Sequence, residues 1–187
     1  MYAMYQATQY VSQANIEGDL VECGVWKGGS SMIGALTLLQ QSDTSRKLYL
    51  YDTYAGMPPP EERDTELGIP MFQMGMEALV SFLGSSYGDI FYASLEEVRT
   101  NMHSTGYPPD NFVFVEGKVE DTIPGIIPDK ISLLRLDSDW YQSTYHELEH
   151  LYPRLSNGGV LIIDDYGAFK GSKDAVDQYF REQNITL

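Results

Sequence analysis

Short apolar runs alternate with amphipathic stretches along most of the chain. Five apolar runs predict strands, at residues 19–23, 47–51, 111–116, 130–136 and 160–163. The remaining periodic stretches have apolar residues at helical spacing and predict helices at residues 2–14, from Ser30 to about 40, 90–103, 144–155 and 172–182. Strands that are apolar throughout and alternate with helices indicate an open parallel sheet covered on both faces. The sequence therefore predicts an α/β fold.

The alternation is interrupted from Thr53 to about Gly88. This segment begins near three consecutive prolines, Pro58 to Pro60, and continues with acidic residues and methionines. An insert of this length is commonly a lid over a site or a disordered loop, although a loop with one helix packed on the body fits equally well. We interpret 53–88 as a lid or insert within a single domain, residues 1–187, of which residues 1–17 form an N-terminal helical segment.

Composition and charge narrow the class of protein. The formal net charge of −15 would repel a phosphate backbone, which argues against nucleic acid as a partner. A single cysteine, Cys23, excludes an intrachain disulfide and suits a reducing compartment. No stretch is long and apolar enough to span a membrane, and the N-terminus lacks the basic and apolar regions of a signal peptide. We therefore expect a cytoplasmic protein without a membrane partner.

Acidic residues stand at the end of every predicted strand. They are Glu22, Asp52, Glu116, the pair Asp137 and Asp139, and the pair Asp164 and Asp165. The carboxyl ends of parallel strands meet at one edge of a sheet, where ligands bind near the switch in strand order. A solvated edge would show one or two such acids by chance, so this clustering predicts a binding site.

The turn after the first strand contains Glu22, Gly24 and a glycine pair before Ser30, but it does not match the G-x-G-x-x-G pyrophosphate fingerprint. Glycines still allow close approach of a cofactor, and the start of the helix supplies free N–H groups. Asp52, at the end of the second strand, is placed to accept from ribose hydroxyls. Turn and acid fit either a nicotinamide cofactor or S-adenosylmethionine (SAM). Glu22 favours the second, which carries a sulfonium and an amine; a tight turn with a structural glutamate is the alternative.

Asp137, Asp164 and Asp165 come from the fourth and fifth strands, which we expect to be neighbours. Converging carboxylates repel one another unless a cation neutralises them or a proton is retained. Donor sets made only of oxygen favour a hard ion such as Mg²⁺. The alternative is an acidic rim whose members cap the following helices.

Residues 146–150 match the H-E-x-x-H pattern of zinc proteases. Leu148 and Leu151 belong to the buried stripe of this predicted helix. At 100° per residue, His146 and His150 fall about 160° and 200° from Leu148, on the opposite face. We therefore expect both histidines to point into solvent and not to form a zinc site.

Taken together, these motifs resemble the macrocin O-methyltransferase family (TylF-type), SAM-dependent enzymes that methylate sugar hydroxyls of antibiotics. The matching segments are 18–30, 51–58, Gly117 with 120–124, 136–141 with 143–144, and 164–167. They cover nearly the whole chain. The fold that the resemblance implies is the class I SAM-dependent methyltransferase (Rossmann-like) sheet.

The resemblance also implies roles for individual residues. It places Glu22, Gly24, Ser30, Asp52, Gly117 and Glu120 at SAM. It makes Asp137, Asp164 and Asp165 ligands of Mg²⁺, and it makes Asp139 the general base. The implied acceptor is a hydroxyl of a small molecule, a sugar of a secondary metabolite or glycan.

The chain departs from the family pattern at its end. The family sheet has seven strands, whereas this sequence stops where a sixth strand would begin, so we expect the C-terminal strands to be missing. A fragment is one explanation, and a compact form whose outer strand edge is bare or covered in a homo-oligomer is another. The alternative functions are a catechol-type O-methyltransferase, a nicotinamide oxidoreductase and a truncated, non-catalytic binder of SAM or metal.

Overall fold

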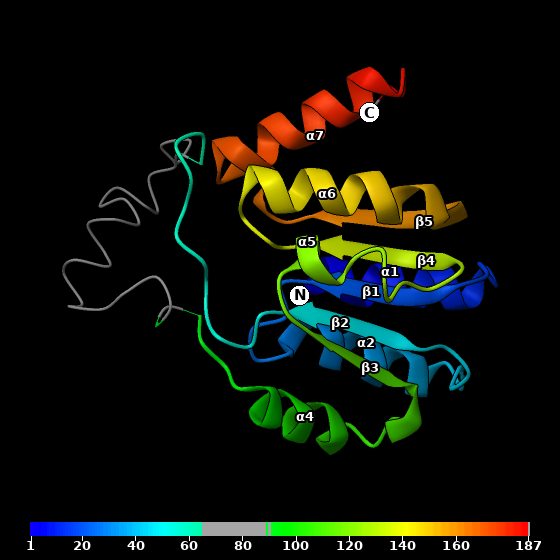
Figure 1. Cartoon of the computed structure of the whole chain (residues 1–187). Coiled ribbons are helices and arrows are strands. Elements are labelled where there is room, and N and C mark those ends of the chain that lie inside the picture. Colours follow the sequence, from blue (N-terminus) through cyan, green and yellow to red (C-terminus); the bar gives the residue numbers. More distant parts are fainter. Residues whose placement is uncertain (65–88, 90, 187) are drawn as a thin grey trace.

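The computed structural model describes residues 1–64, 89 and 91–186. Its sheet is fully parallel and contains β1 (Asp19–Cys23), β2 (Leu48–Asp52), β3 (Phe112–Glu116), β4 (Ile131–Leu136) and β5 (Leu155–Ile163). The strand order is β3-β2-β1-β4-β5, which Figure 1 shows from bottom to top. The predicted class of fold is confirmed.

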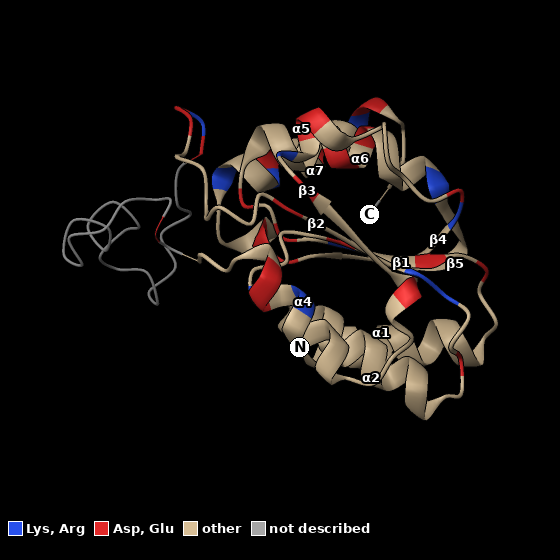
Figure 2. Cartoon of the chain, turned by 60° about the horizontal axis from the view of Figure 1, so that its bottom comes forward, with Lys and Arg blue, Asp and Glu red and all other residues tan. Residues whose placement is uncertain are grey.

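Helices cover both faces of the sheet, as Figure 2 shows. One layer consists of α1 (Tyr2–Gln13), α2 (Gly29–Gln40) and α4 (Leu95–Ser104), and the other of α5 (Val119–Thr122), α6 (Tyr141–Leu151) and α7 (Lys170–Glu182). Short 3₁₀ turns occur at Pro109–Asn111, Tyr152–Arg154 and Asp165–Gly167. None of the helices in the described part of the chain combines the length and the apolar character that crossing a bilayer demands.

Two hydrophobic cores lie on opposite faces of the sheet. Because successive side chains of a strand point to opposite faces, Leu20 packs with α1 and α2 while its neighbour Val21 packs with α6 and α7. In the same way, Leu133 belongs to the first core and Leu134 to the second. Burial on both faces explains why the central strands β1 and β4 are largely apolar instead of alternating with polar residues.

Three boundaries differ from those the sequence predicts. The strand expected at 160–163 begins earlier, at Leu155. The helix expected at 90–103 begins only at Leu95, where the Ser94 hydroxyl accepts from the Glu97 amide. The helix expected at 144–155 begins earlier, at Tyr141, whose amide donates to a carboxylate oxygen of Asp64 over 2.8 Å. This cap comes from far away in the chain, so local sequence could not show it. Of the predicted insert 53–88, residues 65–88 lie outside the described residues.

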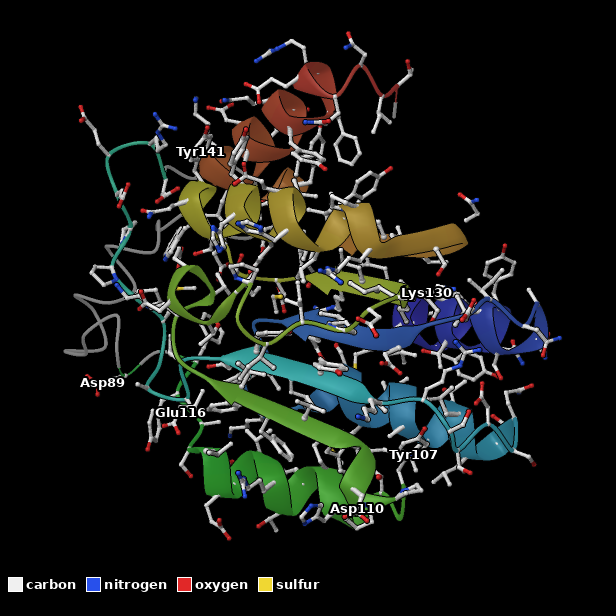
Figure 3. The ribbon with its side chains drawn as sticks, turned by 45° about the vertical axis from the view of Figure 1, so that its right-hand side comes forward. Asp89, Tyr107, Asp110, Glu116, Lys130 and Tyr141 are labelled. Atoms are coloured by element: carbon white, nitrogen blue, oxygen red, sulfur yellow. The ribbon has the colours of Figure 1, made fainter. Side chains whose placement is uncertain are left out.

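The switch in strand order falls between β1 and β4, which pair directly although a long stretch of chain separates them. Gly24 follows β1 with a φ of +79°, and a Cβ there would lie 1.8 Å from the Asp137 carbonyl oxygen. Only glycine permits this approach. Figure 3 shows both ends of the strands. Glu116 and Tyr141 mark the carboxyl edge of the sheet, and Lys130, just before β4, marks the opposite edge.

Candidate functional site

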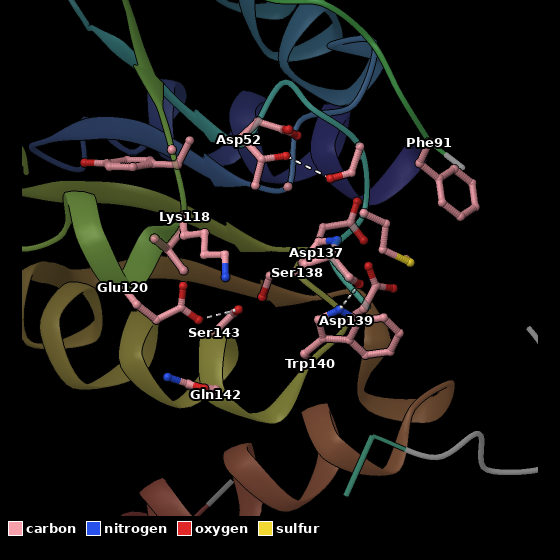
Figure 4. Close-up of a pocket in the computed structure, with 18 of the residues that line it drawn as sticks. Asp52, Phe91, Lys118, Glu120, Asp137, Ser138, Asp139, Trp140, Gln142 and Ser143 are labelled. Carbon is pink, nitrogen blue, oxygen red and sulfur yellow. Dashed lines mark hydrogen bonds between the residues drawn. The ribbon is translucent and has the colours of Figure 1, made fainter. Parts of the chain in front are cut away.

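A cavity of about 430 Å³ lies at the carboxyl edge of the sheet, between the loops that follow β1, β2, β3 and β4 (Figure 4). Six of the predicted site residues line it: Gly24, Asp52, Gly117, Glu120, Asp137 and Asp139. Its volume and its position at the switch in strand order are typical of small-molecule sites. The other four predicted site residues do not line the cavity: Glu22, Ser30, Asp164 and Asp165.

Asp52 holds the first turn together. Its Oδ2 accepts from the amides of Val25 and Trp26 at 2.7 and 2.9 Å, and its Oδ1 accepts from the amide of Tyr54 at 2.7 Å. Three backbone N–H groups therefore fix the carboxylate at the rim of the cavity. Each carboxylate oxygen has two acceptor positions, so capacity remains for a ligand hydroxyl.

Glu22 lies beneath the cavity and is only 2% exposed. The Ser31 hydroxyl donates to its Oε2, and Nη1 of Arg135 donates to its Oε1 over 2.6 Å. Burial raises the pKa of Glu22 to about 7 although Arg135 opposes the shift. The serine that reaches Glu22 is Ser31 and not Ser30, and contact with a cofactor stays a prediction for both Glu22 and Ser30.

Arg135 connects the acids of three strands. Besides Glu22, its guanidinium donates to Oδ2 of Asp137 over 2.7 Å and to Oδ2 of Asp164 over 2.6 Å. The residue is 7% exposed, and the three neighbouring carboxylates raise its pKa against the effect of burial. We did not predict this residue as part of the site. The signal was present in the sequence, because Arg135 is the one charged side chain within the apolar run at 131–136.

The remaining acids lie close together. The Asp139 amide donates to Oδ2 of Asp165 over 3.0 Å, which fixes Asp139 at a φ of +65°. Burial, with Asp165 as the next cause, raises the pKa of Asp139 well above its usual range. Burial raises the pKa of Asp165 to about 7, with Asp137 adding to the shift, and burial raises the pKa of Asp137 to about 6.

The acidic side chains after β4 and β5 offer oxygen donors and negative charge to a hard divalent cation, but within the described residues no three of them bring ligand atoms within 4.8 Å of one another. Arg135 supplies one positive charge against three carboxylates, and within the described residues neither Asp139 nor Asp165 has an ion-pair partner. Burial raises the pKa values of Asp137 and Asp165, and neighbouring carboxylates add to both shifts. The donors are oxygen atoms only, which is the set that Mg²⁺ prefers.

The far wall of the cavity comes from the loop after β3 and from α6. The Ser143 hydroxyl, in the first turns of α6, donates to Oε1 of Glu120 over 2.7 Å. The Trp140 indole donates to the Pro58 carbonyl over 2.9 Å and packs edge-on against Phe169. Trp140 thus joins the start of the insert to the acidic loop after β4.

The H-E-x-x-H segment has a different structure from the one we predicted. Glu147 is completely buried, its Oε2 accepts from the Ser138 hydroxyl over 3.1 Å, and burial raises its pKa well above the usual range. The two histidines lie on another face of α6, as predicted, but both are partly buried. Nε2 of His146 lies 3.0 Å from the Ile123 carbonyl oxygen. The expectation that both point freely into solvent is therefore corrected.

Comparisons with known proteins identify the family of the chain. The chain is 38% identical over 164 residues to 8-demethyl-8-(2,3-dimethoxy-alpha-L-rhamnosyl)-tetracenomycin-C 4′-O-methyltransferase of Streptomyces olivaceus, a match that covers 88% of this chain and 58% of the relative. It is 34% identical to demethyldecarbamoylnovobiocin O-methyltransferase of Streptomyces niveus, with 93% of this chain and 62% of the relative covered. The chain thus spans about three-fifths of the length of the curated relatives it matches.

Solved structures of methyltransferases have a similar fold. The O-methyltransferase NovP superposes with a TM-score of 0.80 at 32% identity, covering 99% of this chain and 72% of NovP. The calicheamicin methyltransferase CalS11 shares the fold with a TM-score of 0.64 at 19% identity, covering 97% of this chain and 68% of CalS11. The model of the family described as macrocin O-methyltransferase (TylF) matches residues 1–187. The chain therefore belongs to the macrocin O-methyltransferase family.

Proposed function

We propose that this chain provides the catalytic domain of a SAM- and Mg²⁺-dependent O-methyltransferase that acts on a sugar hydroxyl of a small molecule, in the cytoplasm. The observation that carries the proposal is the cavity itself, because it brings the glycine turn after β1 and the aspartates after β4 to one place at the switch in strand order. Membership of the family supports the reaction, and the rhamnosyl group in the name of the Streptomyces olivaceus relative supports a sugar acceptor.

SAM would bind between the first turn and the loop after β3. Gly24 lines the cavity and would lie beside the amino acid portion of SAM, and the one acceptor position that remains on Oδ1 of Asp52 suits a ribose hydroxyl. Gly117 and Glu120 line the cavity and would lie beside the adenine. Glu22 contributes from below the cavity by holding Arg135, and Ser30 lies in the first turn of α2. We expect the net negative charge around the turn to favour the positive sulfonium.

Asp137, Asp164 and Asp165 would hold Mg²⁺, which when bound would lower the pKa of a coordinated hydroxyl. Asp139 would then accept the hydroxyl proton. Burial, and next Asp165, raise the pKa of Asp139 above its usual range, which makes its carboxylate a stronger proton acceptor once it is ionised. The acceptor oxygen forms its bond to the methyl carbon as the carbon–sulfur bond breaks, and S-adenosylhomocysteine is the leaving product. Alignment of these atoms within the cavity would supply much of the remaining acceleration.

Methyl transfer to a panel of glycosides and catechols, followed by mass spectrometry, tests the proposal. We expect methylated glycosides, no product after EDTA treatment, and a value of kcat lower by about 10²- to 10⁴-fold in Asp139→Asn. Asp110→Asn, at the opposite end of the sheet, is the matched control and should keep full activity. Turnover that survives Asp139→Asn would disprove the assignment of the base. Methylation of catechols alone would favour the catechol-type alternative, and SAM binding without any turnover would favour a non-catalytic binder.

A further inference from the structure

A second group of metal-ligating side chains lies on α6, outside the acidic cluster. His146, Glu149 and His150 occupy positions i, i+3 and i+4, which share one face of a helix. One ligand atom from each of the three lies within 4.8 Å of the other two. The two imidazole rings are 4.4 Å apart between centroids, and Nε2 of His150 lies 3.8 Å from Oε2 of Glu149. The side chains are partly or fully exposed, so an ion in solution can reach them.

The first histidine is already oriented by the backbone. Its Nε2 lies 3.0 Å from the Ile123 carbonyl oxygen, and because a carbonyl only accepts, Nε2 carries the proton and Nδ1 keeps its lone pair. Histidines that bind metals commonly donate their other N–H to a backbone carbonyl, which fixes the ring and its tautomer. His146 therefore has the support that a ligand needs before any ion is bound.

The glutamate that shares a face of α6 with the two histidines is Glu149 and not Glu147, the glutamate of the H-E-x-x-H pattern. Glu147, the acid of the pattern, is completely buried and accepts from Ser138, so it cannot share an ion with the histidines. Glu149 lies on the same face as the two rings and takes that place. Bonds from zinc to nitrogen or oxygen are about 2.0–2.2 Å long, so small rotations of Glu149 and His150 bring all three ligand atoms onto one ion.

We propose that His146, Glu149 and His150 form a binding site for a borderline divalent ion, Zn²⁺, Ni²⁺ or Cu²⁺, with water in the open positions. The site is independent of the proposed Mg²⁺ site, since imidazole nitrogens favour these ions whereas the aspartate cluster offers oxygen only. An ion there would fix the middle of α6 to the loop that follows α5, through His146 and its contact with Ile123. This loop continues from the cavity wall that contains Glu120.

Calorimetric titration of the full, untagged chain with Zn²⁺, in millimolar Mg²⁺ to occupy the acidic cluster, tests the proposal. We expect one equivalent to bind, and we expect His146→Ala and His150→Ala each to weaken binding by at least about tenfold. His103→Ala is the matched control, because it removes the third histidine of the chain, on α4, and should leave binding unchanged. Circular dichroism of each variant verifies that α6 is still folded.

Electron paramagnetic resonance with one equivalent of Cu²⁺ gives an independent readout. We expect a spectrum with two nitrogen ligands in the original chain and one in His150→Ala. Unchanged Zn²⁺ affinity in His150→Ala would overturn the proposal. Loss of Zn²⁺ binding in Asp165→Asn with retention in both histidine variants would overturn it as well, because the ion would then occupy the acidic cluster.

Discussion

The two halves of the carboxyl edge of the sheet use their acidic residues in opposite ways. In the half formed by β1 and β2, Asp52 accepts three backbone N–H groups from the turns around it, so its charge is compensated locally. In the half formed by β4 and β5, Asp137, Asp139 and Asp165 crowd together, and burial raises the pKa of each. Asp52 therefore needs no further partner, whereas the acids of the second half lack positive charge. The buried Glu22 of β1, whose pKa burial raises to about 7, behaves like the acids of the second half.

This difference shows which half depends on a ligand. The backbone N–H groups that donate to Asp52 belong to the fold itself. The turns around Asp52 therefore keep their conformation whether or not a ligand is bound. Converging carboxylates with raised pKa values are stabilised only by protons or by a cation, so the β4–β5 half changes with pH and with metal. Arg135 lies between the two halves and bonds to Glu22 on one side and to Asp137 and Asp164 on the other.

Of the substitutions that test this difference, removal of Arg135 should change the free energy of unfolding most. We expect Arg135→Met to lower the free energy of unfolding by about 3–5 kcal/mol at neutral pH, because it leaves buried carboxylates without their cation. Urea denaturation measures the change. Lys130→Met, which breaks an exposed ion pair with Glu17, is the control and should cost less than about 1 kcal/mol. Equal costs for the two variants would show that the guanidinium does not stabilise the edge.

The contact between the two halves depends on Gly24. We expect Gly24→Ala to cost roughly 2–4 kcal/mol, from the left-handed backbone and from the collision of its Cβ with the Asp137 carbonyl oxygen. Gly106→Ala is the matched control: it has a φ of +77° but no atom within 4 Å of the added Cβ, so only the backbone cost of about 1 kcal/mol remains. Thermal or urea unfolding of both variants separates the two contributions, and similar losses would contradict the close approach.

The dependence of stability on pH should come from the β4–β5 half and from Glu22 beneath it. In the folded chain, burial raises the pKa values of Glu22 and Asp165 to about 7, so the folded state retains protons that the unfolded state releases near pH 4. The free energy of unfolding therefore falls as pH rises from about 4 to 7. One retained proton gives a loss of about 2 kcal/mol between pH 5 and 6.5.

Urea denaturation at a series of pH values measures this slope. We expect Asp165→Asn and saturating Mg²⁺ each to flatten it, because the first removes a titrating group and the second replaces its proton. A stability that increases between pH 5 and 6.5 would contradict the raised pKa values.

The smallest effect is expected in the half that is already satisfied. Asp52→Asn keeps one acceptor but turns an amide N–H₂ toward backbone donors, and we expect a cost of about 1–2 kcal/mol. Glu116→Gln, at the exposed end of β3, should change the free energy of unfolding by less than about 0.5 kcal/mol. A loss of stability in Asp52→Asn as large as that in Arg135→Met would remove the distinction between the two halves.

The strands, their parallel arrangement and the acids at their ends could be predicted from the sequence, because apolar runs and helical spacing are local patterns. The first residue of α6 could not be predicted, because the Tyr141 amide is capped by Asp64, which lies in the segment after β2. Arg135 was visible only as an exception within an apolar run, and its three carboxylate partners come from different strands. Long-range contacts of this kind leave no spacing rule in the chain.

The sequence by itself determined the class of fold, the family and the side chains available at the carboxyl edge, since each follows from residue type and order along the chain. The tertiary structure decided which of those side chains meet. It placed Glu22 below the cavity, joined it through Arg135 to Asp137 and Asp164, and turned Glu147 inward while Glu149 faces the histidines. Distance and burial set the charge state and the partners of a carboxylate, and both exist only when the strands are brought side by side.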